Sequence, residues 1–345
     1  MRLGILTGGG DCPGLNAVIR AAVTRTVRTY GGHMLGFENG WRGVFENRVR
    51  DLDLGAISGI LPRGGTMLGT SRTDPFRQSG GIDALRAALE RHAIDGLLVC
   101  GGDGTLSASA RLAEAGLPLV GIPKTIDNDV RGTDVSFGFD TALTTVVRAV
   151  DALHTTAESH DRVLVLEVMG RTVGWLAVSA GIAGGADVIL TPEQPVSVSE
   201  TVEFIRHRIA RGRDFSIVVV AEGAQFKPEP DGRVIETPFR VDPEGRRRYG
   251  GIGDVLAREI EERLHVESRT VSLGYVQRGG TPTPFDRLLG TRMGIAAVDL
   301  ARRGEFGRMV SLQGGSIRSV DLQVVREGPR PLDPELYEVA RVFFG

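Results

Sequence analysis

Residues 2–20, RLGILTGGGDCPGLNAVIR, join a short apolar run to a glycine-rich turn and then to an amphipathic segment. A continuous apolar run of this length is typical of a strand buried on both faces, as in a parallel sheet. The segment 14–31 that follows ends at Gly31, a residue that favours helix termination. One helical face of this segment carries Leu15, Val18, Ile19, Ala22 and Val23. The stretch therefore predicts a strand, a turn and a helix in succession.

The same order of strand and helix recurs along the chain. Further apolar runs lie at 96–100, 118–122, 163–168, 216–222 and 270–274, and helical patterns lie between them at 81–93, 141–157, 199–212 and 252–264. Alternating strands and helices predict a doubly wound α/β fold. A length of 345 residues favours two domains or one large α/β unit.

One segment, 226–251, departs from this pattern. It is polar and contains four prolines. We interpret it as a surface excursion or lid rather than a core element.

Composition narrows the class of protein. A net charge of −2 argues against binding to nucleic acid or to an acidic membrane surface. The two cysteines, Cys12 and Cys100, end apolar runs and favour free, reduced thiols over a disulfide framework. The N-terminus shows no signal-peptide pattern, and no apolar run approaches the ~20 residues of a membrane helix. We therefore expect a cytoplasmic protein.

Six turns that follow the apolar runs carry the residues with chemical potential. In an open parallel sheet, ligands bind beyond the carboxyl ends of the strands, so these turns are expected to share one edge. Most of them contain glycine together with an acid, an arginine or a lysine, which is a stronger signal than one glycine-rich turn. The turns are 7–14, 101–105, 123–129, 169–174, 222–225 and 274–280.

The turns 7–14 and 101–105 are candidates for binding phosphate and metal. TGGGDCPG opens a helix and could cradle a phosphate, although an ordinary strand-to-helix turn is an equal alternative. In GGDGT, Asp103 could hold Mg²⁺ on a nucleotide, or it could cap the helix expected at 105–116. We favour the Mg²⁺ role because of the neighbouring turns.

The turn 123–129, PKTIDND, offers a general base. Asp127 or Asp129 could accept a proton from a substrate hydroxyl that Thr125 orients, and the alternative is an Asx-rich turn before a strand. Lys124 is notable because the chain has 41 Lys+Arg residues but only two lysines. A lysine ammonium contacts phosphate as a point charge, whereas arginine forks.

Several arginines near strand ends could neutralise a phosphorylated substrate, although most arginines are solvated surface charges. An acid for metal, an acid as base and several arginines together fit phosphoryl transfer. The arginines are Arg72, Arg162, Arg171, Arg269 and Arg278.

These residues resemble those of a known family. The motifs GGDCPGLNAVIR, GGDGT, PKTIDND, ESHDRVLVLEVMGR, VVVAEG and GYVQRGGTPTPFDR occur in the order seen in 6-phosphofructokinases. The match extends from about Gly4 to Arg308 and is most similar to the actinobacterial type, in which PK precedes TIDND.

The resemblance implies two Rossmann-like, three-layer α/β/α domains with the active site between them. Residues 1–137 plus 278–330 would form a larger domain that binds the phosphoryl donor, and 138–277 plus 331–345 a smaller domain that binds the sugar phosphate. The implied reaction is Mg²⁺-dependent phosphoryl transfer to the 1-hydroxyl of fructose 6-phosphate. A homo-oligomer, tetramer or dimer, is implied as well.

The resemblance also implies roles for individual residues. Asp127 would be the general base in a loop lined by Thr125 and Asp129, with Lys124, Arg72 and Arg171 assisting, and Asp103 would hold Mg²⁺. The donor phosphates would be surrounded by Gly9, Gly10, Ser71, Arg72, Gly102, Gly104 and Thr105. The sugar would be held by Met169, Gly170, Arg171 and Glu222, and its 6-phosphate by Arg162, Arg269, Tyr275 and Arg278, with Arg162 and Arg269 reaching in from a neighbouring subunit.

The chain departs from the family pattern at three places. Tyr275 stands where many members have histidine, and a phenol can still donate to phosphate. The segment 226–251 is longer than in compact bacterial members, and His154 lies where ATP-dependent bacterial enzymes often carry an effector-site arginine.

Two residues bear on the identity of the phosphoryl donor, and they favour different donors. In this family an aspartate after the GGD motif excludes ATP, so Gly104 favours ATP, whereas Lys124 resembles the pyrophosphate-using enzymes. We give exclusion by charge the greater weight, and expect ATP with pyrophosphate as the alternative. Two rival functions are an NAD or lipid kinase that shares GGDGT and a non-catalytic sensor of phosphosugars.

Overall fold

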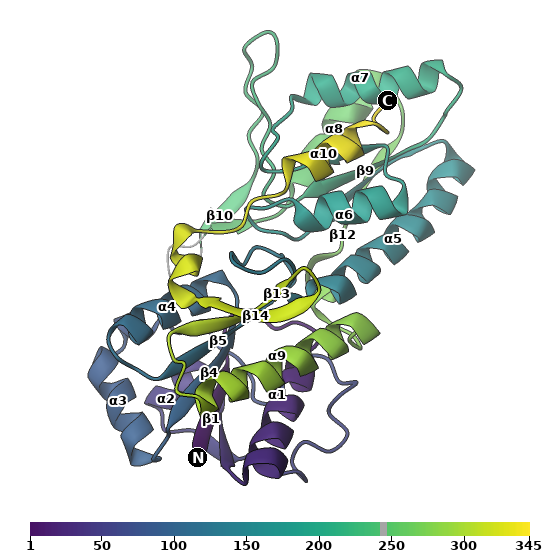
Figure 1. The fold of residues 1–345 in the computed structure, drawn as a ribbon. Coiled ribbons are helices and arrows are strands. Elements are labelled where there is room, and N and C mark those ends of the chain that lie inside the picture. Colours follow the sequence, from purple (N-terminus) through teal and green to yellow (C-terminus); the bar gives the residue numbers. More distant parts are fainter. Residues whose placement is uncertain (242–246) are drawn as a thin grey trace. The chain divides into compact units, whose positions relative to one another are not determined.

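The computed structural model describes residues 1–241 and 247–345, which form two compact units. Unit 1 comprises Met1–Thr141 and Arg278–Arg330, and unit 2 comprises Ala142–Gln277 and Pro331–Gly345. Each unit contains a largely parallel sheet with helices packed on it, which confirms the predicted α/β class (Figure 1). None of the described helices is both long and apolar enough to cross a membrane.

The sheet of unit 1 has eight strands. Its order is β14-β13-β5-β4-β1-β2-β3, with β6 paired to β5. The central pairs are parallel, whereas β3 and β14 run antiparallel to their neighbours. The strands are β1 (Arg2–Thr7), β2 (His33–Phe37), β3 (Val49–Asp51), β4 (Gly96–Gly101), β5 (Leu119–Thr125), β6 (Phe137–Gly138), β13 (Arg308–Gln313) and β14 (Ser316–Asp321).

Helices cover both faces of this sheet (Figure 1). Leucines and valines of the strands pack against α2, α3 and α4 in one core cluster. The helices α1 and α9 pack closely against each other, because Gly294 allows the approach: a Cβ there would lie 2.7 Å from the carbonyl oxygen of Val18. The helices are α1 (Leu15–Thr24), which continues as a π-helical turn (Arg25–Thr29), α2 (Trp41–Phe45), α3 (Gly81–Arg91), α4 (Asp103–Glu114) and α9 (Pro284–Arg302), with short 3₁₀ turns at Pro75–Arg77 and Leu322–Glu327. A further helix, α5 (Phe139–His160), begins in unit 1 and belongs mostly to unit 2.

Unit 2 contains a four-stranded parallel sheet in the order β12-β7-β9-β8. Alternate residues of its strands pack against α7 and α8, and every residue of β7 and β9 is buried, as expected for strands covered on both faces. The elements are β7 (Val163–Val168), α6 (Trp175–Gly184), β8 (Val188–Leu190), α7 (Val198–Ala210), β9 (Ser216–Ala221), α8 (Ile252–Leu264), β12 (Ser268–Ser272), a 3₁₀ turn (Gly274–Arg278) and α10 (Pro334–Arg341).

The polar segment 226–251 is only in part the surface excursion that the sequence predicts. It forms a small antiparallel pair, β10 (Phe239–Val241) and β11 (Arg247–Tyr249), and residues 242–246 lie outside the described residues. Its first residues belong to the core of unit 2, because Phe226 is 9% exposed and packs in the apolar cluster. The buried Glu229 accepts hydrogen bonds from the backbone N–H of Val198 and from Arg263. The excursion prediction was therefore wrong for these residues.

Asp286, at the start of α9, joins three segments of unit 1. Its fully buried carboxylate accepts hydrogen bonds from the N–H of Gly138 and from the N–H and hydroxyl of Thr141. Burial raises the pKa of Asp286 to about 6, although these hydrogen bonds oppose the shift.

This raised pKa predicts a pH-dependent effect on stability. A folded-state pKa above the ordinary value of 3.8 means that the stability contributed by Asp286 is complete only well below pH 3.8 and is lost as the pH rises through about 6. Relative to an Asp286→Asn variant, we expect the wild type to lose about 2 kcal/mol of unfolding free energy between pH 4 and pH 7. Thermal unfolding of both proteins across this range tests it. A difference in melting temperature that stays constant with pH would contradict the assignment.

Candidate active site

Three glycine-containing loops of unit 1 meet at the carboxyl ends of β1, β4 and β5. The parallel register pairs Thr7 with Cys100 and Gly101 with Pro123, so the three strands end together. A Cβ at Gly8 would lie 2.8 Å from the Thr105 side chain, which shows how closely the loops approach. A fourth segment joins them, since the N–H of Gly9 donates to the carbonyl of Ser71 at 2.9 Å. The structure thus brings together Gly9, Gly10, Ser71, Gly102 and Thr105, as the sequence predicts.

Two cations contact this glycine loop. Lys124 donates from Nζ to the carbonyl of Gly10, and Arg278 donates from Nη1 to the carbonyl of Asp11 at 3.2 Å. Both side chains are buried, at 3% and 8% exposed. Burial lowers the pKa of Lys124, and the nearby Arg278 lowers it further, whereas Cys12 and Asp127 oppose the shift. Two buried cations beside a loop of backbone N–H groups are suited to a polyanionic phosphate.

The first turn of α4 carries Asp103 and Gly104. Gly102, not Asp103, is the N-cap residue, so the alternative role of Asp103 as a capping residue is not found. A Cβ at Gly104 would meet nothing within 4 Å, so the space beside this position is open. Among the described residues, no three His, Cys, Asp or Glu side chains form a metal cluster. One carboxylate fits Mg²⁺ that takes its other ligands from donor phosphates and water.

Lys124 and Thr125 lie on β5, which extends to Thr125 rather than ending before Pro123 as the sequence predicts. The strand pairing holds their backbones, and the turn proper begins at Ile126. The hydroxyl of Thr125 accepts a hydrogen bond from the N–H of Asp127 at 3.0 Å. Asp127 and Asp129 are 4% and 3% exposed.

The carboxylate of Asp127 has one oxygen, Oδ1, that is buried and forms no hydrogen bond in the structure. Buried carboxylate oxygens are rarely left so, because desolvation without a partner is costly. Nε of Arg278 and the hydroxyl of Ser71 are in the same condition. Such atoms in one cluster with two cations indicate a ligand site.

In unit 2, a loop with unusual backbone geometry follows β7. Gly170 has φ 148° and Arg171 has φ 54°, in the left-handed region that a non-glycine residue rarely adopts. The N–H of Arg171 donates to the carboxylate of Glu222 at 3.1 Å, and Gly223 is required because a Cβ there would lie 1.6 Å from the Arg171 carbonyl oxygen. The N–H of Met169 donates to Gln277 at 3.1 Å. The structure therefore brings together Met169, Gly170, Arg171 and Glu222.

Arg162 and Arg269 do not join this group. Arg162 immediately precedes β7, and Arg269 is the second residue of β12, whereas Met169 follows the end of β7. With a rise of ~3.3 Å per residue, Arg162 and Met169 lie roughly 20 Å apart, at opposite ends of the same strand. The two arginines are instead bound to a shared carboxylate, Glu267.

The remaining predicted site residues, Tyr275 and Arg72, are exposed. The Tyr275 side chain is 74% exposed, so its hydroxyl is available to a ligand. Arg72 directly follows Ser71, whose backbone contacts the glycine loop.

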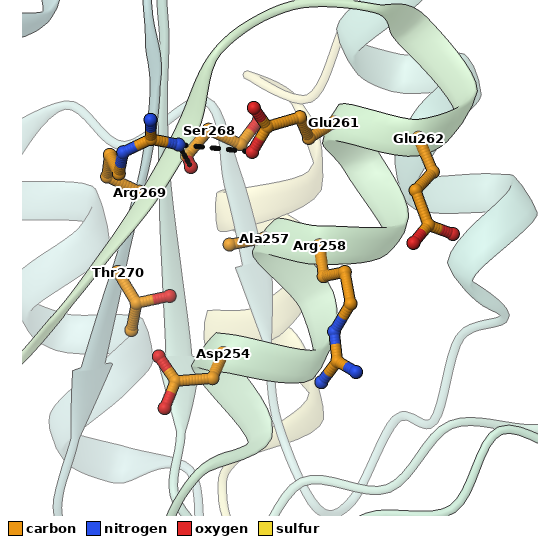
Figure 2. Close-up of a pocket in the computed structure, with 8 residues that line it drawn as sticks. All are labelled: Asp254, Ala257, Arg258, Glu261, Glu262, Ser268, Arg269 and Thr270. Carbon is orange, nitrogen blue, oxygen red and sulfur yellow. Dashed lines mark hydrogen bonds and ion pairs between the residues drawn. The ribbon is translucent and has the colours of Figure 1, made fainter.

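A pocket of about 370 Å³ opens between α8 and β12 of unit 2. Figure 2 shows Arg269 and Glu261 facing each other on it, with Arg258, Glu262 and Asp254 along α8. The pocket lies at the Arg269 edge of the sheet and is highly charged.

Sequence reasoning missed three residues that position the loops. Gln277 is fully buried and holds Met169, Glu193 accepts from the N–H groups of Gly174 and Leu332, and Glu167 accepts from those of Gly251 and Gly253. The sequence signals that could have identified them are the glutamates near the ends of apolar runs, Glu167 and Glu193, and the glutamine that begins the QRGG motif.

Comparison with known proteins identifies the family of this chain. The sequence model of the family described as Phosphofructokinase matches residues 2–301. The chain belongs to the phosphofructokinase family. It is therefore an enzyme of the phosphotransferase class.

Relatives of this phosphofructokinase are named for either of two donors. The chain is 50% identical over its full length, and that of the relative, to a "Pyrophosphate--fructose 6-phosphate 1-phosphotransferase" of Streptomyces coelicolor. It is 49% identical to "ATP-dependent 6-phosphofructokinase 2" of the same organism, over 93% of this chain and 94% of the relative. Among solved structures, phosphofructokinase from Saccharomyces cerevisiae has a TM-score of 0.80 and 30% identity, over 99% of this chain and 46% of the yeast chain.

Proposed function

We propose that this phosphofructokinase transfers a phosphoryl group from ATP to the 1-hydroxyl of fructose 6-phosphate, giving fructose 1,6-bisphosphate. The observation that carries the proposal is the carboxylate of Asp127, which presents a buried oxygen without a hydrogen bond in the same cluster as Lys124, Arg278 and the glycine loop. A base for the acceptor hydroxyl and cations for phosphate are the two things that this reaction needs.

Each residue then has a chemical task. Asp127 takes the proton of the 1-hydroxyl while the oxygen of that hydroxyl bonds to the terminal phosphorus of ATP. The bond between this phosphorus and the bridging oxygen breaks, and its electrons remain on ADP. Thr125 fixes the start of the Asp127 turn through its hydrogen bond. Lys124, Arg278 and Arg72 stabilise the phosphate charge, with Gly9, Gly10, Ser71, Gly102, Gly104 and Thr105 around the donor and Asp129 beside the acceptor. Mg²⁺ held by Asp103 and the donor phosphates would neutralise further charge.

The preference for ATP rests on Gly104. Relatives named for ATP and for pyrophosphate are almost equally identical to the chain, so the residues themselves carry the argument. The open space at Gly104 leaves room for a donor larger than pyrophosphate. Lys124, which already contacts the backbone of Gly10, would add a phosphate contact without setting the donor.

The remaining predicted site residues are proposed to bind the sugar phosphate. Met169, Gly170, Arg171 and Glu222 would hold the sugar, and Arg162, Arg269, Tyr275 and Arg278 would hold its 6-phosphate. Arg162 and Arg269 lie at the far edge of their own sheet from Met169, which supports their acting on the substrate of a second copy. We therefore propose a cytoplasmic homo-oligomer, tetramer or dimer.

The test is formation of fructose 1,6-bisphosphate from fructose 6-phosphate and Mg²⁺, with ATP and with pyrophosphate in parallel. We expect turnover with ATP only. Turnover with pyrophosphate only would mean that Lys124, not Gly104, sets the donor. Absence of turnover with both donors would overturn the proposed function.

A further inference from the structure

Glu267 bridges the two arginines at the far edge of the unit 2 sheet. One carboxylate oxygen, Oε2, lies 2.7 Å from Nε of Arg162, and the other, Oε1, lies 2.8 Å from Nη2 of Arg269. The pKa of Glu267 lies below its ordinary value, chiefly because Arg162 donates to it. One carboxylate thus holds two guanidinium groups as a pair.

The register of the sheet makes this bridge possible. Ser268 pairs with Val163 and Arg269 with Leu164, so Glu267 and Arg162 stand side by side just before their strands begin. The backbones are joined as well, because the N–H of Val163 donates to the carbonyl of Glu267 at 3.0 Å. Backbone pairing, and not a flexible loop, therefore fixes the position of Glu267 beside Arg162.

We propose that Glu267 is a positioning residue that assembles Arg162 and Arg269 into one binding element for the 6-phosphate of the sugar. The inference rests on the proposed role of these arginines in fructose 6-phosphate binding. A phosphate dianion is best bound by two cations held close together, but two guanidinium groups repel each other. Glu267 offsets that repulsion before the substrate arrives, while further N–H donors of each arginine remain for phosphate.

Electrostatics alone would give the opposite expectation. Glu267 carries a negative charge, so its removal makes the edge more positive and would favour an anion. Glu261 separates the two effects, because it also binds Arg269, at 3.1 Å (Figure 2), whereas the ion pair of Arg162 is with Glu267. Removing the Glu261 charge leaves the bridge intact, whereas removing that of Glu267 breaks it.

The experiment compares the Glu267→Gln and Glu261→Gln variants in the full-length enzyme. We expect Glu267→Gln to raise KM for fructose 6-phosphate by roughly two- to fivefold, the size typical of an exposed ion pair. Its kcat and its KM for the donor should stay near wild-type values. A general loss of structure would change these two constants as well. Glu261→Gln should leave KM for the sugar unchanged or slightly lower. A matched control is Glu338→Gln, which breaks an exposed ion pair with Arg341 on α10.

A second measurement asks whether Glu267 acts through the arginines. Glu267→Gln should add nothing to KM in an Arg162→Ala, Arg269→Ala background. An unchanged or lower KM in the Glu267→Gln single variant, with the arginine variants impaired, would overturn this inference alone. Arginine variants with a normal KM would overturn the arginine assignment and the inference with it. A wild type inactive on fructose 6-phosphate would overturn both this inference and the proposed function.

Discussion

The Asp127→Asn variant is expected to lose kcat for fructose 6-phosphate by a factor of roughly 10² to 10⁴, the usual contribution of a general base. Asparagine has nearly the shape of aspartate but cannot accept the proton of the 1-hydroxyl. The Oδ1 atom of Asp127 is buried without a hydrogen-bond partner in the structure, so the substitution breaks no hydrogen bond at that atom. The variant should therefore fold, and calorimetry should show sugar-phosphate binding close to that of the wild type.

Asp151→Asn serves as the matched control, since Asp151 is exposed on α5 and belongs to no proposed site. It should retain wild-type kcat and binding. If Asp127→Asn kept more than a tenth of the wild-type kcat, the proton would be accepted elsewhere, and Asp129 would be the next candidate.

The Gly104→Asp variant is expected to lose activity with ATP while it keeps or gains activity with pyrophosphate. A carboxylate placed about 4 Å from a donor phosphate costs on the order of 4 kcal/mol at an intermediate dielectric, which corresponds to a loss of about 10³-fold. The variant should fold, because a Cβ at position 104 enters open space and an acid suits the first turn of a helix. Measurement of kcat/KM with each donor at saturating sugar phosphate tests it.

Gly104→Asn separates charge from size, because asparagine fills the same space without a charge. We expect it to lose much less activity with ATP than the aspartate variant does. Equal losses in both variants would mean that bulk, not repulsion, excludes ATP. An aspartate variant that retained full ATP activity would show that the donor phosphates do not lie beside α4.

Local pattern was enough to predict much of the fold. The run 163–168 is β7 and the segment 252–264 is α8, because strands covered on both faces and amphipathic helices each leave a strong periodic signal. The convergence of the loops 7–14, 101–105 and 123–129 also followed from the sequence, since parallel strands end at one edge.

What the sequence could not predict depends on pairing between distant segments. Lys124 lies on β5 and not in the turn after it, because β4 pairs with β5 as far as Pro123 and β6 extends the pairing to Lys124 and Thr125. The burial of Phe226 and Glu229 in unit 2 depends on α7 and α8, which local polarity does not reveal. The bridge at Glu267 requires the register between β7 and β12, whose residues are about a hundred positions apart.

The path of the chain constrains the order in which the protein can form during synthesis. Unit 2 is inserted between Thr141 and Arg278 of unit 1, and the last residues, Pro331–Gly345, return to unit 2. When the ribosome has made the first 141 residues, β5 still lacks its neighbour β13, and α1 lacks its neighbour α9. The nascent N-terminal segment therefore waits with an open strand edge and a bare apolar helix face until more than 310 residues have been made. A chaperone that binds exposed apolar surface would be needed longest between the synthesis of residue 141 and that of β13.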